Sequence, residues 1–235
     1  MFQNCKLGLK EPDHGRVAMV PAFPADQLIC TTPMDWQAGR AWDGDMLGNL
    51  QYNDCGPAAA VNILKLLALC NNMPLTFSVQ DALDTYGLLG WDGTPATDQG
   101  VVLLDLMYLW QRVGIGGIPL STFWRIGFGD PAHVATAIST GGPLLGAFRL
   151  PLVCKSTDQW DDIAAADTRE WGPHAVALFA SSDGWLRGKS WGRVVDISPR
   201  FIIAKCMEMY LPVSKVLRAP SGVPLDRLLR LGAQL

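Results

Sequence analysis

This chain of 235 residues has no excess of basic residues: 19 Lys and Arg stand against 22 Asp and Glu, for a formal net charge of −3. That balance leaves no positive surface for a nucleic-acid backbone, so we expect no nucleic-acid partner. Charged residues are only 17% of the chain and apolar residues 49%, a composition that excludes a disordered chain. A chain of this length can bury a core without a metal or a disulfide.

A long uncharged apolar run is also missing. The longest apolar stretch, Val101–Leu120, contains Asp105, Arg112 and several glycines, whereas a membrane-spanning helix needs about 20 nearly uncharged residues. The first residues, Met1–Gly15, mix lysines with acidic residues and have no apolar centre, so they do not resemble a secretory signal. We therefore expect no membrane span and synthesis in the cytoplasm.

No two cysteines stand at Cys-x-x-Cys spacing, which argues against a zinc knuckle or a thioredoxin-like redox motif. We expect neither a metal nor a cofactor. In a reducing compartment most of the cysteines should be small buried side chains. The six are Cys5, Cys30, Cys55, Cys70, Cys154 and Cys206.

The order of the patterns along the chain predicts an α+β protein. Residues 1–47 indicate an extended arm punctuated by prolines, residues 48–130 a helical lobe, residues 131–197 a β lobe, and residues 198–235 a helical tail. Because helices come first and strands second, we expect one two-lobed domain over 1–235 rather than alternating βαβ units. The expected helices are 57–69, 79–86, 100–113 (capped by Asp98), 134–140, 199–209 and about 224–231, and the expected strands are 144–150, 175–180 and 185–191.

Cys55 stands at the start of the most apolar of these helices, directly before Gly56 and Pro57. A helix N-terminus carries partial positive charge, which favours a reactive thiolate. A cysteine nucleophile also needs a histidine within hydrogen-bond reach. Of the three histidines, His174 begins an apolar strand that can hold its ring rigidly. For an arbitrary cysteine and histidine, structural packing remains the default interpretation.

Further residues favour a catalytic role for Cys55 and His174 over simple packing. Asp35-Trp36 lies upstream of Cys55, and Lys189-Ser190-Trp191-Gly192 lies on the strand expected to return beside His174. With Cys55 preceding His174, these residues resemble the papain family of cysteine peptidases. The resemblance implies a papain-like fold, a Cys55–His174 pair, and a peptide or protein substrate in a groove between the lobes. It also implies that Trp191 covers the His174 ring.

A closer likeness is to papain-fold proteins encoded by tailed bacteriophages and prophages. It rests on residues 46–49 before Asp54-Cys55, on Asp98-Gln99-Gly100 with residues 103–117, and on residues 220–226, and it runs from about residue 33 to the end. This resemblance implies Asp98 and Gly100 as groove-lining residues. It also implies synthesis in a host-cell cytoplasm and neighbouring virion proteins as partners.

Two positions depart from the papain pattern. The Asn that orients the histidine in papain is replaced by Lys189, whose ammonium cannot accept a ring N–H. The Gln that donates to the oxyanion in papain is replaced by Asn49, with Gln51 as an alternative donor. The site predicted from the resemblance therefore comprises Cys55, His174, Asn49, Gln51, Ser190 and Lys189.

Two functions follow from these residues. In the first, the protein is a cysteine peptidase or amidase that cleaves a viral protein, a host protein or a cell-wall peptide. In the second, it is a catalytically silent papain-like component of a capsid, neck or tail, because Lys189 stands in the orienting position and the chain is unusually apolar.

Overall fold

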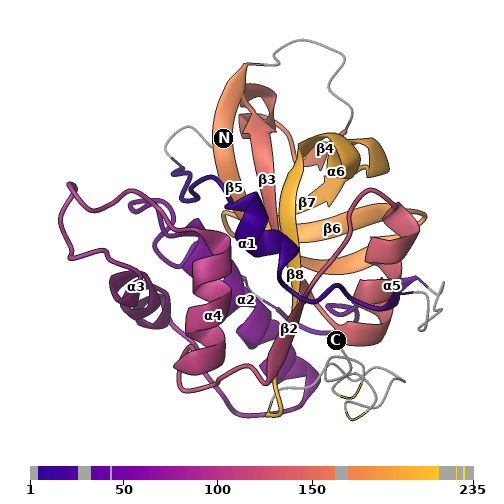
Figure 1. The fold of residues 1–235 in the computed structure, drawn as a ribbon, viewed down its shortest axis with the longest axis horizontal. Coiled ribbons are helices and arrows are strands. Elements are labelled where there is room, and N and C mark those ends of the chain that lie inside the picture. The colour runs from indigo at the N-terminus through magenta and orange to yellow at the C-terminus, as the bar shows by residue number, and fades with distance from the viewer. Residues whose placement is uncertain are drawn as a thin grey trace.

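The structure is a computed structural model that describes residues 5–25, 33–42, 44–161, 169–216, 226 and 230. A group of helices lies beside one large sheet (Figure 1). The helices of the described residues are α1 (His14–Ala18), α2 (Cys55–Cys70), α3 (Val79–Leu88), α4 (Leu103–Arg112), α5 (Pro131–Gly141) and α6 (Pro199–Lys205), and a 3-10 turn is η2 (Leu152–Lys155). The strands are β1 (Met34–Asp35), β2 (Thr122–Arg125), β3 (Leu144–Pro151), β4 (Gln159–Trp160), β5 (Glu170–Ser182), β6 (Trp185–Ser190), β7 (Arg193–Ile197) and β8 (Cys206–Val213). In Figure 1, α2, α3 and α4 lie to the left of the sheet, and α5 and α6 lie at its right.

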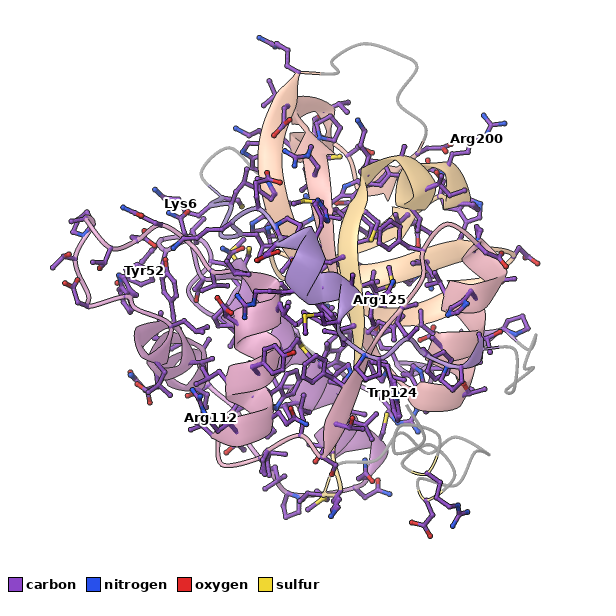
Figure 2. The ribbon with its side chains drawn as sticks, in the orientation of Figure 1. Lys6, Tyr52, Arg112, Trp124, Arg125 and Arg200 are labelled. Atoms are coloured by element: carbon purple, nitrogen blue, oxygen red, sulfur yellow. The ribbon has the colours of Figure 1, made fainter. Side chains whose placement is uncertain are left out.

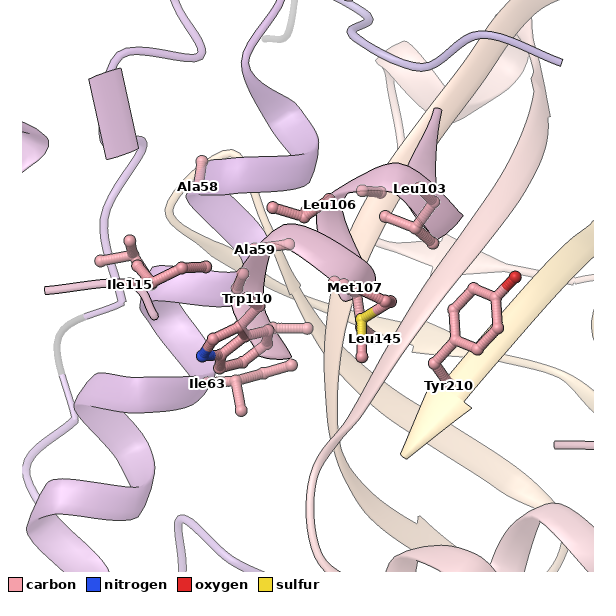
Figure 3. Close-up of a cluster of buried hydrophobic side chains, with 14 of the residues drawn as sticks. Ala58, Ala59, Ile63, Leu103, Leu106, Met107, Trp110, Ile115, Leu145 and Tyr210 are labelled. Carbon is pink, nitrogen blue, oxygen red and sulfur yellow. The ribbon is translucent and has the colours of Figure 1, made fainter. Parts of the chain in front are cut away.

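Helix α2 is the buried helix that the sequence predicts. All of its residues except Lys65 and Leu69 are buried, because its apolar side chains cover its whole circumference. It packs between α4 and the sheet: Ile63 lies in one cluster with Trp110 of α4 and Leu145 of β3 (Figure 3). This packing holds the N-terminal tip of α2, and with it Cys55, in a defined place.

The sheet has the strand order β2-β8-β3-β5-β6-β7-β4, with β1 also paired to β5. The strand pairs are antiparallel except β4 with β7. Asp183 and Gly184 join β5 to β6 in a two-residue turn, with φ angles of 51° and 79°. Positive φ at both residues suits the right-handed twist of a hairpin. The hairpin predicted from the sequence is therefore confirmed, and it brings His174 and Ser190 to the same end of the sheet.

The C-terminal part of the sheet differs from expectation. The helix predicted over 199–209 ends at Lys205, and Cys206–Val213 forms β8 between β2 and β3. Met209, Tyr210 and Leu211 are all buried, and a short continuous apolar run does not distinguish a buried strand from a helix. The helix expected over 224–231 falls outside the described residues, apart from Asp226 and Arg230.

Two further helix boundaries were predicted wrongly. The arm contains α1, whose first N–H groups are capped by the Asp13 side chain, and a single turn is too short to show a helical period. Helix α4 begins at Leu103 with Val102 at its N-cap position, so Asp98 is not its cap.

Within the described ranges, no helix is long and apolar enough to cross a bilayer.

Candidate active site

The structure places Cys55 next to the strand that carries His174. Cys55 is the first residue of α2, and His174 lies in β5, paired with Phe148 of β3. The backbone N–H of Ala175, next to His174, donates to Cys55 Sγ at 3.4 Å. The sulfur at the helix tip therefore sits against the strand that carries the imidazole.

The His174 ring is held by two neighbours. Its Nε2 atom lies 3.0 Å from Ser190 Oγ, and its ring stacks on Trp191 with centroids 3.9 Å apart and an interplanar angle of 18°. Trp171 stacks on the other side of Trp191, at 4.9 Å. The Nδ1 atom is buried and has no hydrogen-bond partner among the described residues. If Nε2 carries the proton and donates it to Ser190, Nδ1 keeps a free lone pair, which is the form that a general base needs.

The N-terminal arm covers the sulfur. The Gly8 N–H donates to Cys55 Sγ at 3.1 Å. Beyond Gly8 the arm pairs in parallel with Val101: Val101 N–H donates to Gly8 O at 3.0 Å, and Lys10 N–H donates to Val101 O at 2.8 Å. Cys55 is 2% exposed and His174 is 1% exposed, so neither side chain is open to solvent.

The arm is also bound before Gly8. Lys6 N–H donates to Asn49 O at 3.2 Å, and the indole N–H of Trp191 donates to Lys6 O at 3.1 Å. Figure 2 shows Lys6 on the same side of the molecule as Tyr52, which lies in the loop before Cys55. The arm thus binds to the loop before α2 and to the residue that stacks on His174.

Ion pairs fasten the arm to both lobes. Glu11 pairs with Arg149 of β3 at 2.6 Å, and Arg16 pairs with Asp105 of α4 at 2.6 Å. All four side chains are at least one-third exposed, so solvent screens both pairs and each contributes little. The buried apolar side chains of the arm, among them Leu9 and Val17, contribute more to its attachment.

Solved structures with the same arrangement of elements are cysteine proteases. Xylellain from Xylella fastidiosa matches with a TM-score of 0.64 over 89% of this chain and 96% of that one, at 13% identity. The chain has a papain-like fold. The proform of the ragweed protease Amb a 11 matches at 0.62 (90% and 75% covered, 14% identity), and procathepsin L 3 of Tenebrio molitor larval midgut at 0.60 (90% and 76%, 14%). No protein-family model and no curated protein matches the sequence.

Among the described residues, the hydrogen-bond partner of the His174 ring is Ser190, and the prediction that Lys189 takes this position was wrong. The Lys189 Nζ atom lies 5.1 Å from the centroid of the Trp42 ring. Successive side chains of a strand alternate between the two faces of a sheet, so two neighbours on β6 cannot both reach His174. A hydroxyl can accept the ring N–H, which an ammonium cannot.

The two predicted oxyanion donors are not directed at the sulfur. The Asn49 side-chain amide donates to Tyr52 O at 3.2 Å, and the Asn49 side chain is buried in the loop. Gln51 is exposed, and its backbone N–H bonds to Gly48 O within the same turn. The backbone N–H of Cys55 is then the nearest candidate donor, because the first N–H groups of a helix have no intrahelical partner.

Asp98 lies against the loop before Cys55, and Gly100 lies against the arm. The Asp98 carboxylate accepts the Asn53 N–H at 2.7 Å and the Tyr86 hydroxyl at 3.0 Å, so it fixes the loop before Cys55. Gly100, with φ of +74°, faces the backbone of Gly8. The sequence did not predict that arm residues cover Cys55, because an extended segment carries no sign of what it packs against.

Burial decides the charge of Cys55 and His174. Burial raises the pKa of the Cys55 thiol to about 12, although N–H groups of Ala175, Gly8 and Gly56 oppose this shift. Burial also lowers the pKa of His174 to about 3. Both groups are therefore neutral at pH 7. The prediction of a thiol activated by the helix N-terminus is wrong for this conformation, because the loss of hydration outweighs the partial charge of the helix.

A labelling experiment checks whether the Cys55 thiol is enclosed and neutral. With the arm in place, we expect iodoacetamide at pH 7.5 to modify the half-buried Cys5 at least about 10-fold faster than Cys55, because the thiolate is the reacting form and Cys55 is enclosed. Peptide mapping of the adducts measures both rates in one sample. Faster labelling of Cys55 would contradict the enclosed site.

Asp54, the residue before Cys55, is also buried. It is 0% exposed, and neither carboxyl oxygen makes a hydrogen bond of normal geometry with a described residue. Burial raises the pKa of this carboxyl to about 8, with a smaller opposing influence from Asn49. Asp54 is therefore mostly protonated at pH 7. Its charge, when present, disfavours the Cys55 thiolate.

Proposed function

We propose that the protein is a cysteine peptidase or amidase whose groove is closed by its own N-terminal arm in this conformation. The observation that carries the proposal is the contact between Cys55 Sγ and the strand of His174, with the ring oriented by Ser190. The papain-like fold supports it, since the solved structures with this fold are cysteine proteases.

The reaction would follow acyl transfer to sulfur. The Cys55 proton moves to His174 Nδ1, and Sγ attacks the carbonyl carbon of the peptide bond. The tetrahedral intermediate then expels the amine, which takes the proton from His174, and leaves a thioester on Cys55. Water, deprotonated by His174, releases the acid and restores the thiol. Ser190 acts as a positioning residue, and no cofactor is required.

The closed conformation is inactive for an electrostatic reason. Moving a proton from the Cys55 thiol to the His174 imidazole is strongly unfavourable in this conformation, because burial raises the pKa of the thiol and lowers the pKa of the imidazole, so that the two pKa values lie far apart. Release of the arm would admit water to both groups and reduce that difference. Activity is therefore expected only after the arm has left the groove.

The test uses an arm that cannot close. Leu9 is 8% exposed and packs in the same cluster as Val101 and Cys55, so Leu9→Asp places a charge in an apolar site and should displace the arm. We expect this full-length variant to hydrolyse unfolded casein, measured by mass spectrometry of the products. The addition of Cys55→Ser should reduce the rate at least about 100-fold, while Cys154→Ser should not.

Two results would overturn the proposal. One is equal hydrolysis with and without Cys55→Ser. The other is an open variant in which Cys55 is readily alkylated and yet no peptide or isopeptide bond is cleaved.

A second candidate function is a catalytically silent component of a phage particle. The neutral, enclosed state of Cys55 and His174 favours it, together with the resemblance to phage-encoded papain-fold proteins. In this proposal the protein is made in the host cytoplasm and joins neighbouring virion proteins. Cys55→Ala should then leave particle assembly and infectivity unchanged. A tenfold loss of infectivity with normal particles would count against it.

A further inference from the structure

The arm passes over Cys55 through a narrow slot between the backbone of Asn53 and that of Gly100. The slot accommodates Gly8 and leaves no room for a larger residue at that position. A Cβ atom built on Gly8 would lie 2.1 Å from Asn53 O, 2.4 Å from Asn53 C and 2.8 Å from Cys55 N. These are backbone atoms, and such distances are far below van der Waals contact. A side chain at position 8 would therefore require the arm or the loop to move.

The opposite wall of the slot is equally close. A Cβ atom on Gly100 would lie 2.5 Å from Gly8 O and 2.6 Å from Gly8 C. The Gly100 N–H donates to the Tyr86 hydroxyl at 2.9 Å, and that hydroxyl donates to Asp98. Glycine on this wall lets the two backbones approach each other.

Both walls depend on the same carboxylate. Asp98 accepts the Asn53 N–H at 2.7 Å on one side and the Tyr86 hydroxyl at 3.0 Å on the other, while the Asn53 side chain donates to Asp98 O at 2.5 Å. The loop that carries Asn53 is therefore tied to the segment that carries Gly100. The slot can therefore widen only if these hydrogen bonds of Asp98 break.

Apolar side chains occupy the groove on either side of the slot. Leu7 lies against Gly172 of β5, where an added Cβ would come within 2.8 Å of Leu7 Cδ1. Leu9 is 8% exposed and packs against Val101 and the start of α2. The groove thus accommodates an apolar residue, then glycine, then another apolar residue.

We propose that the position over Cys55 is a glycine-selecting subsite, and that the peptides this groove binds carry glycine there between two leucine-like residues. The inference rests on the proposed function in taking the groove as a peptide-binding site, and it adds the class of peptide. The segment Lys6–Lys10 is the ligand bound in this conformation. Its Gly8 N–H donates to Sγ, so the sulfur faces the N–H side of this peptide bond and not the carbonyl carbon that it would have to attack. The segment therefore binds without being cleaved.

The first test is Gly8→Ala in the full-length protein. The added methyl group should expel the arm from the slot, so iodoacetamide at pH 7.5 should label Cys55 at least about 10-fold faster than in the wild-type protein. Gly87→Ala is the matched control, because a Cβ at that helical position has nothing within 4 Å, and it should leave the labelling rate unchanged. Cys154, which is 0% exposed, reports folding, since it should stay unlabelled in every folded variant.

The second test restores the ligand as a separate peptide. Acetyl-Lys-Leu-Gly-Leu-Lys-Glu amide at millimolar concentration should slow Cys55 labelling of the Gly8→Ala protein, whereas the same peptide with alanine in place of glycine should not. If Gly8→Ala exposes Cys154, the Leu9→Asp protein takes its place as receptor for both peptides.

Two outcomes would overturn the proposal. The first is a wild-type labelling rate for Cys55 in Gly8→Ala, and the second is equal protection by the glycine and alanine peptides. Because each readout is alkylation of Cys55, a failure of the subsite can be told apart from a failure of peptidase activity, which is measured by hydrolysis.

Discussion

Asp54→Asn is expected to stabilise the protein by about 2–5 kcal/mol at pH 8, up to about five-thousandfold in the folding equilibrium, and by only a few tenths of a kcal/mol at pH 4. Asparagine has the shape of the protonated acid that burial enforces at this position, and it is as good an N-cap residue as aspartate. Urea denaturation at the two pH values measures the difference.

The sign follows from where the proton is bound. The folded-state pKa of Asp54 is raised from 3.8 to about 8, so between these values the folded protein holds a proton that the unfolded chain has released. Folding is then disfavoured increasingly as the pH rises from about 4 to 8. Asparagine does not titrate, so the variant escapes this loss.

Asp92→Asn provides a control of opposite sign. The exposed Asp92 carboxylate accepts hydrogen bonds from Thr94 N–H at 2.9 Å and from the Thr97 hydroxyl at 2.5 Å, and the pKa of Asp92 is lowered to about 2, first by the Thr97 hydrogen bond. Its stabilisation is present above pH 4 and lost below it, so Asp92→Asn should destabilise at pH 8. If Asp54→Asn raised the free energy of unfolding equally at pH 4 and pH 8, the Asp54 carboxyl would not be buried and protonated.

His174→Phe is expected to gain stability relative to the wild-type protein as the pH falls, by about 2 kcal/mol between pH 8 and pH 5. Burial lowers the pKa of His174 from 6.5 to about 3, so below pH 6.5 the unfolded chain binds a proton that the folded protein excludes. The wild-type protein therefore loses stability between pH 6.5 and 3, and a phenylalanine, which can also stack on Trp191, does not.

The matched variant His174→Gln separates titration from packing. Glutamine retains an N–H for Ser190 and loses the stacked ring, so its stability at pH 8 should be lower than that of His174→Phe. Its dependence on pH should nevertheless be the same, because neither side chain titrates. The contrary result is a difference in the free energy of unfolding between the wild-type protein and both variants that stays constant from pH 8 to pH 5. It would show that His174 is hydrated and that the arm does not close the site.

The elements predicted correctly are those whose signal is local. The uniformly apolar segment after Pro57 could only be a buried helix, and Ser78 with Asp81 forms the capping box at the start of α3. The Asp183-Gly184 dipeptide identifies a hairpin turn, and it places the strand of Ser190 beside the strand of His174.

The predictions that failed depended on distant contacts. Cys206–Val213 becomes a strand because β2 and β3 offer it hydrogen-bonding edges on both sides, and nothing within the segment records those neighbours. Aspartate is a common helix-cap residue, but the Asp98 carboxylate accepts hydrogen bonds from Asn53 and Tyr86, and Val102 takes the N-cap position of α4. Lys189 was assigned to the histidine from a local motif, whereas the face on which each β6 side chain lies is set by the register with β5.

The sequence by itself determined the α+β class and the position of Cys55 at the tip of a buried helix. Its resemblance to papain-like proteins predicted that His174 lies near Cys55. Tertiary structure alone decided the protonation of that pair and the access to it. A helix end would stabilise a thiolate in water, but here Gly8 and its neighbours exclude water from the sulfur. Since hydration of a charge is worth more than the partial charge of a helix terminus, the segment that covers the thiol governs its reactivity.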